Sequence, residues 1–115
     1  QSIDYFKRVQ TDMGMAEAER AMRLYMVPGM LHCRGGAGVD QFGGAGALLP
    51  IGSADADLLA ALTEWVEQGK APQHIKAVRL ENGQVTRERI LCPYPAQAHF
   101  LGGDSGDASR YQCRP

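Results

Sequence analysis

The 115-residue sequence predicts an α/β fold in which this chain is one part of a larger, sheet-containing domain. An apolar run over residues 21–27 is typical of a buried strand, and residues 54–68 have the periodicity of an amphipathic helix. A β-hairpin is predicted over residues 75–90, and it is polar and exposed in character. Because one buried strand cannot form a sheet alone, we expect its neighbours to lie outside this chain.

The first helix is expected over residues 3–13, with Ser2 as its N-cap and Gly14 at its C-terminal end. Its apolar face would consist of Tyr5, Phe6, Val9 and Met13. A short helical turn is predicted over residues 16–20. The strand over residues 21–27 follows.

A loop is predicted from Met30 to Gly46, after the turn dipeptide Pro28-Gly29 has stopped the strand. The loop is rich in glycine, which tolerates unusual backbone dihedral angles and close approach of other groups. Loops of this length in compact domains are mostly functional or disordered. We therefore expect the functional residues of the chain here.

The clearest helix is expected over residues 54–68, with Ser53 as its N-cap and Gly69 at its end, and Pro72 prevents its resumption. Its apolar stripe would consist of Leu58, Leu59, Leu62, Trp65 and Val66. Asn82-Gly83 lies between two strand-like runs, which is a strong hairpin signal.

Net charge and hydropathy exclude two classes of partner. The net charge is -1, so no basic excess is present to neutralise nucleic-acid phosphates. No apolar run approaches the roughly 20 residues of a membrane-spanning helix. The chain does not open on a signal peptide, and its start has the pattern of an internal segment of a longer protein.

Three cysteines, Cys33, Cys92 and Cys113, leave three interpretations open. All three thiols are reduced in a cytosolic protein, or one is a reactive thiol, or one has a partner in a part of the protein outside this chain. Spacing alone does not choose between them.

His32 is the candidate catalytic residue, because it lies on the glycine-rich loop five residues after the expected strand. Sites in open α/β folds cluster at the carboxyl ends of strands, and in α/β hydrolases the histidine comes after the serine and the acid. An imidazole there can accept the serine proton at Nε2 while an acid holds Nδ1. The alternative is a surface histidine without a role.

A nucleophile is not evident, because the chain contains no Gly-x-Ser-x-Gly motif. Ser2 and Ser53 have the positions of helix caps. Cys33 as a thiolate nucleophile is disfavoured, because it is adjacent to His32 and neighbouring residues on a loop seldom present both side chains to one substrate. A zinc site would need His32, Cys33, Cys92 and Cys113, whose spacing does not fit. The stretch 104–107 lacks the later glutamate of a calcium loop. We therefore predict no metal and no cofactor in this chain.

Three stretches resemble the tannase and feruloyl esterase family. Residues 23–38 (RLYMVPGMLHCRGGAG) are similar to the histidine region of that family, and residues 62–72 (LTEWVEQGKAP) and 91–95 (LCPYP) are similar to later segments. Their order and rough spacing match, and the resemblance covers nearly the whole chain. The block Val-Pro-Gly-Met-x-His-Cys is its most specific part.

The resemblance implies a secreted or periplasmic serine esterase with an α/β-hydrolase core, of which residues 1–115 are the C-terminal part. His32 would be the catalytic base, and Cys33 would form a disulfide with a cysteine beside the nucleophile, holding their Cα atoms within about 7 Å. Cys92 and Cys113 would form a second disulfide, worth about 3 kcal/mol in the chain-entropy model. Both bridges imply an oxidising compartment.

The family's nucleophile motif is absent from this chain, and Asp4 and Asp12 do not match its acid motif. The nucleophile, the acid and the lid, with any calcium site in that lid, are therefore expected outside this chain. The isolated chain should thus be inactive, and its partner would be the remainder of the same enzyme. The substrates of the whole enzyme would be small esters of aromatic acids (gallates, hydroxycinnamates or related). Exposed core surfaces would favour dimerisation. The alternative function is a small, non-enzymatic, disulfide-tied binding module, which would leave Cys33 without a role.

Overall fold

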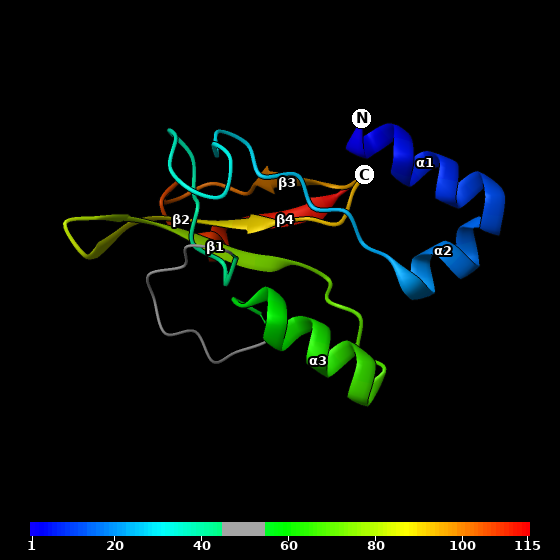
Figure 1. The fold of residues 1–115 in the computed structure, drawn as a ribbon. Helices are drawn as coiled ribbons and strands as arrows, with labels where there is room; N and C mark the ends of the chain where they lie inside the picture. Colours follow the sequence, from blue (N-terminus) through cyan, green and yellow to red (C-terminus); the bar gives the residue numbers. More distant parts are fainter. Residues whose placement is uncertain (45–54) are drawn as a thin grey trace.

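The computed structural model describes residues 1–44 and 55–115. These residues form helices and short antiparallel strands (Figure 1). The helices are α1 (Ser2–Met13), α2 (Met15–Ala21), α3 (Leu58–Gln68) and the short 3-10 helix η1 (Ala108–Arg110). The strands are β1 (Ile75–Glu81), β2 (Gln84–Leu91), β3 (Gln97–Phe100) and β4 (Tyr111–Arg114). No helix among the described residues is long and apolar enough to cross a membrane.

The predicted hairpin is confirmed, since β1 pairs with β2 in antiparallel register. Asn82 and Gly83 both have positive φ, 52° and 76°, as a two-residue turn of type I′ requires. The pairing shifts register between Arg79 and Leu80, which marks a β-bulge. A second antiparallel pair, β3–β4, was not predicted, because its strands are only four residues long.

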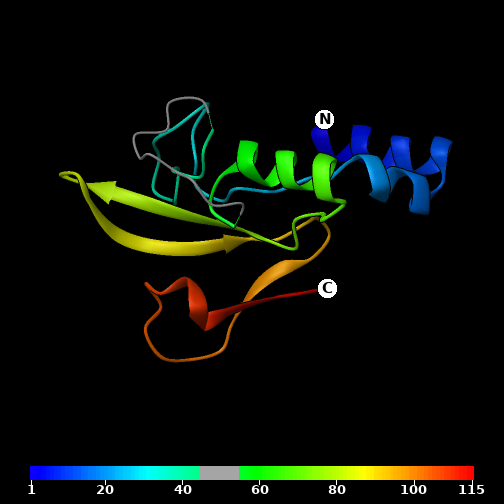
Figure 2. The same cartoon turned by 90° about the horizontal axis from the view of Figure 1, so that it is seen from below.

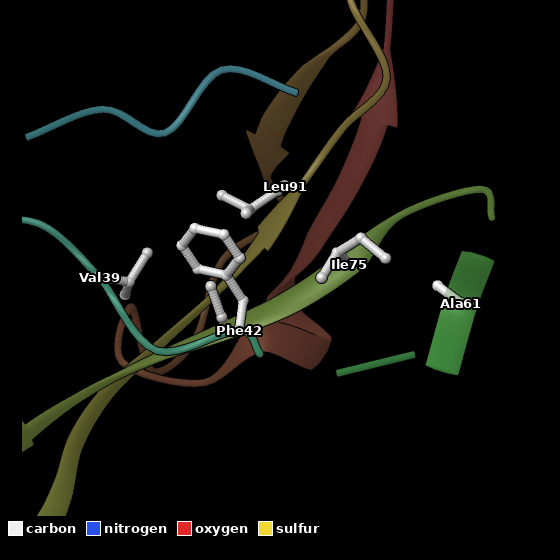
Figure 3. Close-up of a cluster of buried hydrophobic side chains, with 6 residues drawn as sticks. Val39, Phe42, Ala61, Ile75 and Leu91 are labelled. Carbon is white, nitrogen blue, oxygen red and sulfur yellow. The ribbon is translucent and has the colours of Figure 1, made fainter. Parts of the chain in front are cut away.

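The hairpin lies at the centre of the fold, between α3 on one side and β3–β4 on the other (Figure 2). The prediction that it is polar and exposed was wrong for β1, where Ile75, Ala77 and Val78 are buried. Buried residues from α3, the hairpin and the segment before residue 45 form one cluster (Figure 3): Val39, Phe42, Ala61, Ile75, Ala77 and Leu91. Contacts from these separate segments bury β1.

The buried strand predicted over residues 21–27 is not present in the structure. The segment is extended, but its one strand-like contact is an isolated bridge between Tyr25 and Pro93. Beside it, Tyr94 N donates to Leu24 O at 2.7 Å, and Met26 is 46% exposed. An apolar run becomes a buried strand only where neighbours pair along its length, and the described residues pair with it at this point alone.

The helix caps differ from the prediction in detail. Helix α1 begins at Ser2 itself, with Gln1 at the N-cap and no side-chain capping bond. Helix α3 is capped by Asp57, whose carboxylate accepts from Leu59 N and Ala60 N. The predicted cap Ser53 lies outside the described residues. Gly69 ends α3 in the left-handed conformation, as predicted.

The apolar stripe of α3 is only partly buried. Ala61 packs into the core, whereas Leu59, Leu62 and Val66 are 69%, 52% and 77% exposed. Trp65, predicted to be a core residue, is half-buried, with the Arg23 guanidinium 5.1 Å from its ring centroid. One helical face is therefore apolar and uncovered in this chain.

Candidate active site

Residues 29–38, which carry His32, form a loop that backbone hydrogen bonds close into a ring, called the His32 ring below. At its base, Gly38 N donates to Gly29 O at 3.0 Å, and nearer the tip Leu31 N donates to Gly35 O at 3.0 Å. Met30 and Gly36 form an isolated antiparallel bridge between these two bonds. His32 lies at the exposed tip, so local hydrogen bonds limit the movement of the turn that presents it.

Close approach of the two sides of this ring requires glycine at two positions. A Cβ at Gly36 would lie 2.1 Å from Gly29 O, and the φ of Gly36 is +97°. A Cβ at Gly38 would lie 2.1 Å from Pro28 O. Both distances are far inside van der Waals contact, so these glycines are needed for the ring to close.

The chain that leaves the ring is attached to the central hairpin. Val78 N donates to Gln41 O at 2.9 Å, and Asp40 N and Gln41 N both donate to Val78 O. The Asp40 carboxylate reaches back and accepts from Gly35 N at 2.7 Å. The base of the ring is thereby held against β1, next to Arg79.

His32 and Cys33 meet at the tip, where Nδ1 of the imidazole lies 3.0 Å from Sγ of the thiol. Adjacent side chains were not expected to face one point. In this contact Cys33 has a positive φ of 70°, a backbone conformation that is uncommon for residues other than glycine. Both residues are exposed, and the Cys33 thiol is free.

No carboxylate is bonded to His32 within residues 1–44 and 55–115. His74 and His99 lie elsewhere on the surface. Over the same ranges, no group of three histidine, cysteine or acidic side chains is placed to hold a metal ion. Within the described residues, His32 therefore has Cys33 as its neighbour among the predicted site residues.

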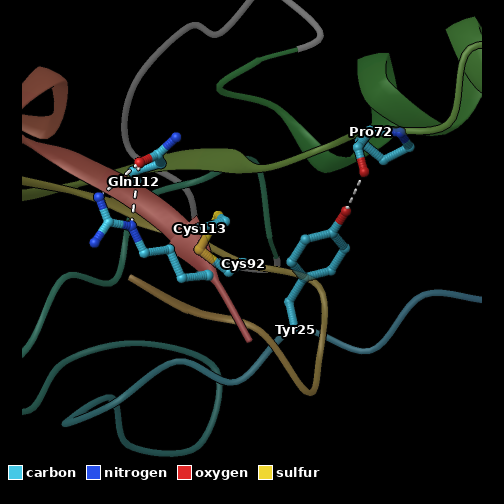
Figure 4. The surroundings of a disulfide bond; sticks show 6 residues. Tyr25, Pro72, Cys92, Gln112 and Cys113 are labelled. Carbon is cyan, nitrogen blue, oxygen red and sulfur yellow. Dashed lines mark hydrogen bonds between the residues drawn. A yellow bond between two sulfur atoms is a disulfide. The ribbon is translucent and has the colours of Figure 1, made fainter. Parts of the chain in front are cut away.

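The disulfide between Cys92 and Cys113 is present, with 5.6 Å between the Cα atoms (Figure 4). This confirms the predicted pair and removes both cysteines from any zinc site. The bridge connects the end of β2 to β4. Close by, the Tyr25 hydroxyl donates to Pro72 O at 2.9 Å. Burial raises the pKa of Tyr25, and the positive charge of Arg23 partly opposes that rise.

A cavity of about 510 Å³ lies between residues 26–28 and strand β2. It is lined by apolar side chains such as Met26, Val39 and Leu91, together with Tyr94. His32 does not line it. This cavity is therefore separate from the candidate base.

Sequence reasoning missed two arginines of the hairpin that contact the ring. Arg79 and Arg87 donate to backbone carbonyls of residues 36–38. No local pattern marks them, since more than 40 residues separate each donor from its acceptor.

The family model of tannase and feruloyl esterase matches residues 1–114. The chain belongs to the tannase and feruloyl esterase family.

Relatives and solved structures within this family are much longer than the chain. It is 41% identical, over 86% of its length, to an uncharacterized esterase of Xanthomonas campestris pv. campestris, of which it covers 18%. It is 37% identical, over 97% of its length, to a mono(2-hydroxyethyl) terephthalate hydrolase of Piscinibacter sakaiensis, of which it covers 17%. The crystal structure of feruloyl esterase B from Aspergillus oryzae matches 98% of the chain with a TM-score of 0.86 and 27% identity, and the chain covers 23% of it.

Proposed function

We propose that the full-length protein is a serine carboxylic-ester hydrolase that acts on small esters of aromatic acids, with His32 as its general base. Two relatives in the family are named for such substrates, a feruloyl esterase and a hydrolase of a terephthalate monoester. The observation that carries the proposal is the exposed imidazole at the tip of the His32 ring, within the segment that the family model matches.

The proposed chemistry divides the reaction between the two ring nitrogens of His32. Nε2 takes the proton of a serine hydroxyl as that oxygen attacks the ester carbonyl, and later returns it to the departing alcohol. Nδ1–H donates to a carboxylate, which orients the imidazole and stabilises the imidazolium. Water then hydrolyses the acyl-enzyme with the same histidine as base. The serine and the acid come from the rest of the protein.

Cys33 is proposed to bond to a cysteine beside that serine. The thiol now lies 3.0 Å from Nδ1, the nitrogen that the acid needs. Thiol–disulfide exchange with a disulfide donor of the oxidising compartment would oxidise the two thiols, and the donor would leave as a dithiol that carries both electrons and both protons. The thiol proton of Cys33 is then gone and only a weakly accepting sulfur remains, so Nδ1–H becomes available to a carboxylate. The same bond would hold the base loop against the nucleophile loop.

Residues 1–115 are proposed to be the C-terminal part of an α/β-hydrolase domain and to be inactive alone. The uncovered apolar face of α3, which includes Leu59, Leu62 and Val66, supports packing against another part of the same protein. The disulfide between Cys92 and Cys113 supports a secreted or periplasmic enzyme, since such bonds persist in oxidising compartments.

The test compares three histidine variants of the full-length protein on methyl ferulate, methyl gallate and mono(2-hydroxyethyl) terephthalate. His32→Ala should lower kcat by roughly 10⁴-fold or more, the usual cost of removing the base of a triad. His74→Ala and His99→Ala, which replace exposed histidines outside the ring, should retain activity. Hydrolysis by His32→Ala at the wild-type rate would sink the proposal. Peptide mapping without reductant should also recover Cys33 in a disulfide with a serine-flanking cysteine.

A further inference from the structure

The two arginines of the hairpin that face the ring are direct cross-strand partners. Arg79 of β1 is paired with Arg87 of β2, immediately before the register shift. Like charges directly opposite each other in an antiparallel pair destabilise it. The pair is therefore stabilised by acceptors that offset the two positive charges.

The acceptors are three consecutive carbonyls on one side of the His32 ring. Nη1 of Arg79 donates to Gly36 O and to Gly38 O, the latter at 2.9 Å. Nη1 of Arg87 donates to Ala37 O, which lies between them, at 3.3 Å. On its far side, Nε of Arg79 donates to the Glu81 carboxylate at 3.1 Å. The Arg79 side chain is only 26% exposed, so its contacts are partly shielded from water.

We propose that Arg79 is a positioning residue for His32, with Arg87 as its assistant. This inference rests on the proposed role of His32 as the base. Arg79 touches neither His32 nor any reacting atom. It acts on the carbonyls that follow the tip of the ring, and those residues also close the ring onto Gly29 and pair with Met30.

The geometry of the guanidinium suits this task. A planar group with several fixed N–H donors can bind two carbonyls and a carboxylate at once, whereas a lysine ammonium is a point charge that cannot hold the same set. Loss of these bonds leaves residues 35–38 held by the backbone bonds to Gly29 and Leu31, by the Asp40 carboxylate and by Arg87 alone. A displacement of the imidazole by about 1 Å is expected to cost up to roughly 10²-fold in rate.

The inference is tested in the full-length enzyme with Arg79→Met and Arg79→Lys. Both should lower kcat by roughly ten- to a hundredfold while KM changes little, because the positioning acts on the base and not on substrate binding. Hydrogen exchange of the peptide covering residues 28–40 should become faster in both variants. Arg79→Lys keeps the charge, so it serves if Arg79→Met does not fold.

Lys76→Met is the matched control. Lys76 is a cation on the same strand that is ion-paired with Glu88 at 3.0 Å, yet it makes no contact with the ring. This variant should keep kcat and the exchange rate of residues 28–40 at their wild-type values. An equal loss of kcat in Lys76→Met and Arg79→Lys would mean that general stability is responsible, and would overturn the inference.

A double variant separates this inference from the proposed function. If Arg79 acts through His32, Arg79→Lys should lower the residual activity of His32→Ala no further. Full activity of His32→Ala would refute the proposed function. An inactive His32→Ala together with wild-type kcat in Arg79→Lys would refute the positioning role alone.

Discussion

Replacing Gly38 by alanine should displace His32 without touching it. A Cβ at this position would lie 2.1 Å from Pro28 O, whereas real Cβ contacts are not shorter than 3.0 Å. The backbone at Gly38 and the carbonyl of Pro28 must therefore separate by about 0.9 Å at the base of the ring. Overpacking of this kind costs about 1–3 kcal/mol of stability.

The kinetic effect follows from the size of that shift. A misplacement of about 1 Å costs up to roughly 10²-fold in rate, so we expect kcat of the full-length Gly38→Ala enzyme to fall by that order. The assay is steady-state hydrolysis of methyl ferulate, well below the unfolding temperature of the variant. KM should change much less than kcat, because the ring positions the base.

Gly35→Ala is the control within the same ring. Its φ is +79°, so alanine there costs about 1 kcal/mol in backbone strain, but no atom lies within 4 Å of the new Cβ. It should lose stability comparable to the lower end expected for Gly38→Ala and retain most of its kcat. Wild-type kcat in Gly38→Ala, or an equal loss in both variants, would show that close approach at the base does not position His32.

Three further predictions concern stability of the full-length protein. Replacing both Cys92 and Cys113 by alanine should lower the free energy of unfolding by about 3 kcal/mol in urea titrations, and reductant should then have no further effect through this bridge. Asp57→Ala should cost about 1 kcal/mol in the same assay, because it removes the cap of α3; an unchanged urea midpoint would contradict this. Tyr25→Phe should cost about 1 kcal/mol through the lost bond to Pro72. The pKa of Tyr25 is raised above its ordinary 10.0, so its phenol ionises at a lower pH in the unfolded chain than in the folded protein. The free energy of unfolding should therefore fall as pH rises above 10.0. Tyr25→Phe should lack that part of the fall when melting is measured against pH.

The candidate site could be predicted only in part from sequence. His32 and Cys33 were singled out because the motif around them is specific, but neither their mutual contact nor the positive φ of Cys33 was predicted. Arg79 and Arg87 could not be identified, because their acceptors become neighbours only after the hairpin has packed on the ring. The disulfide between Cys92 and Cys113 was expected from the resemblance, and the structure contains it.

The sequence alone determined the elements whose signals are local. Gly69 ends α3 and Asn82-Gly83 turns the hairpin, since both depend on dihedral angles that few residues adopt. Tertiary structure alone decided that β1 is buried and that residues 21–27 form no strand. Burial and strand pairing depend on which distant segments supply contacts and hydrogen-bond partners, and the periodicity of one segment carries no record of them.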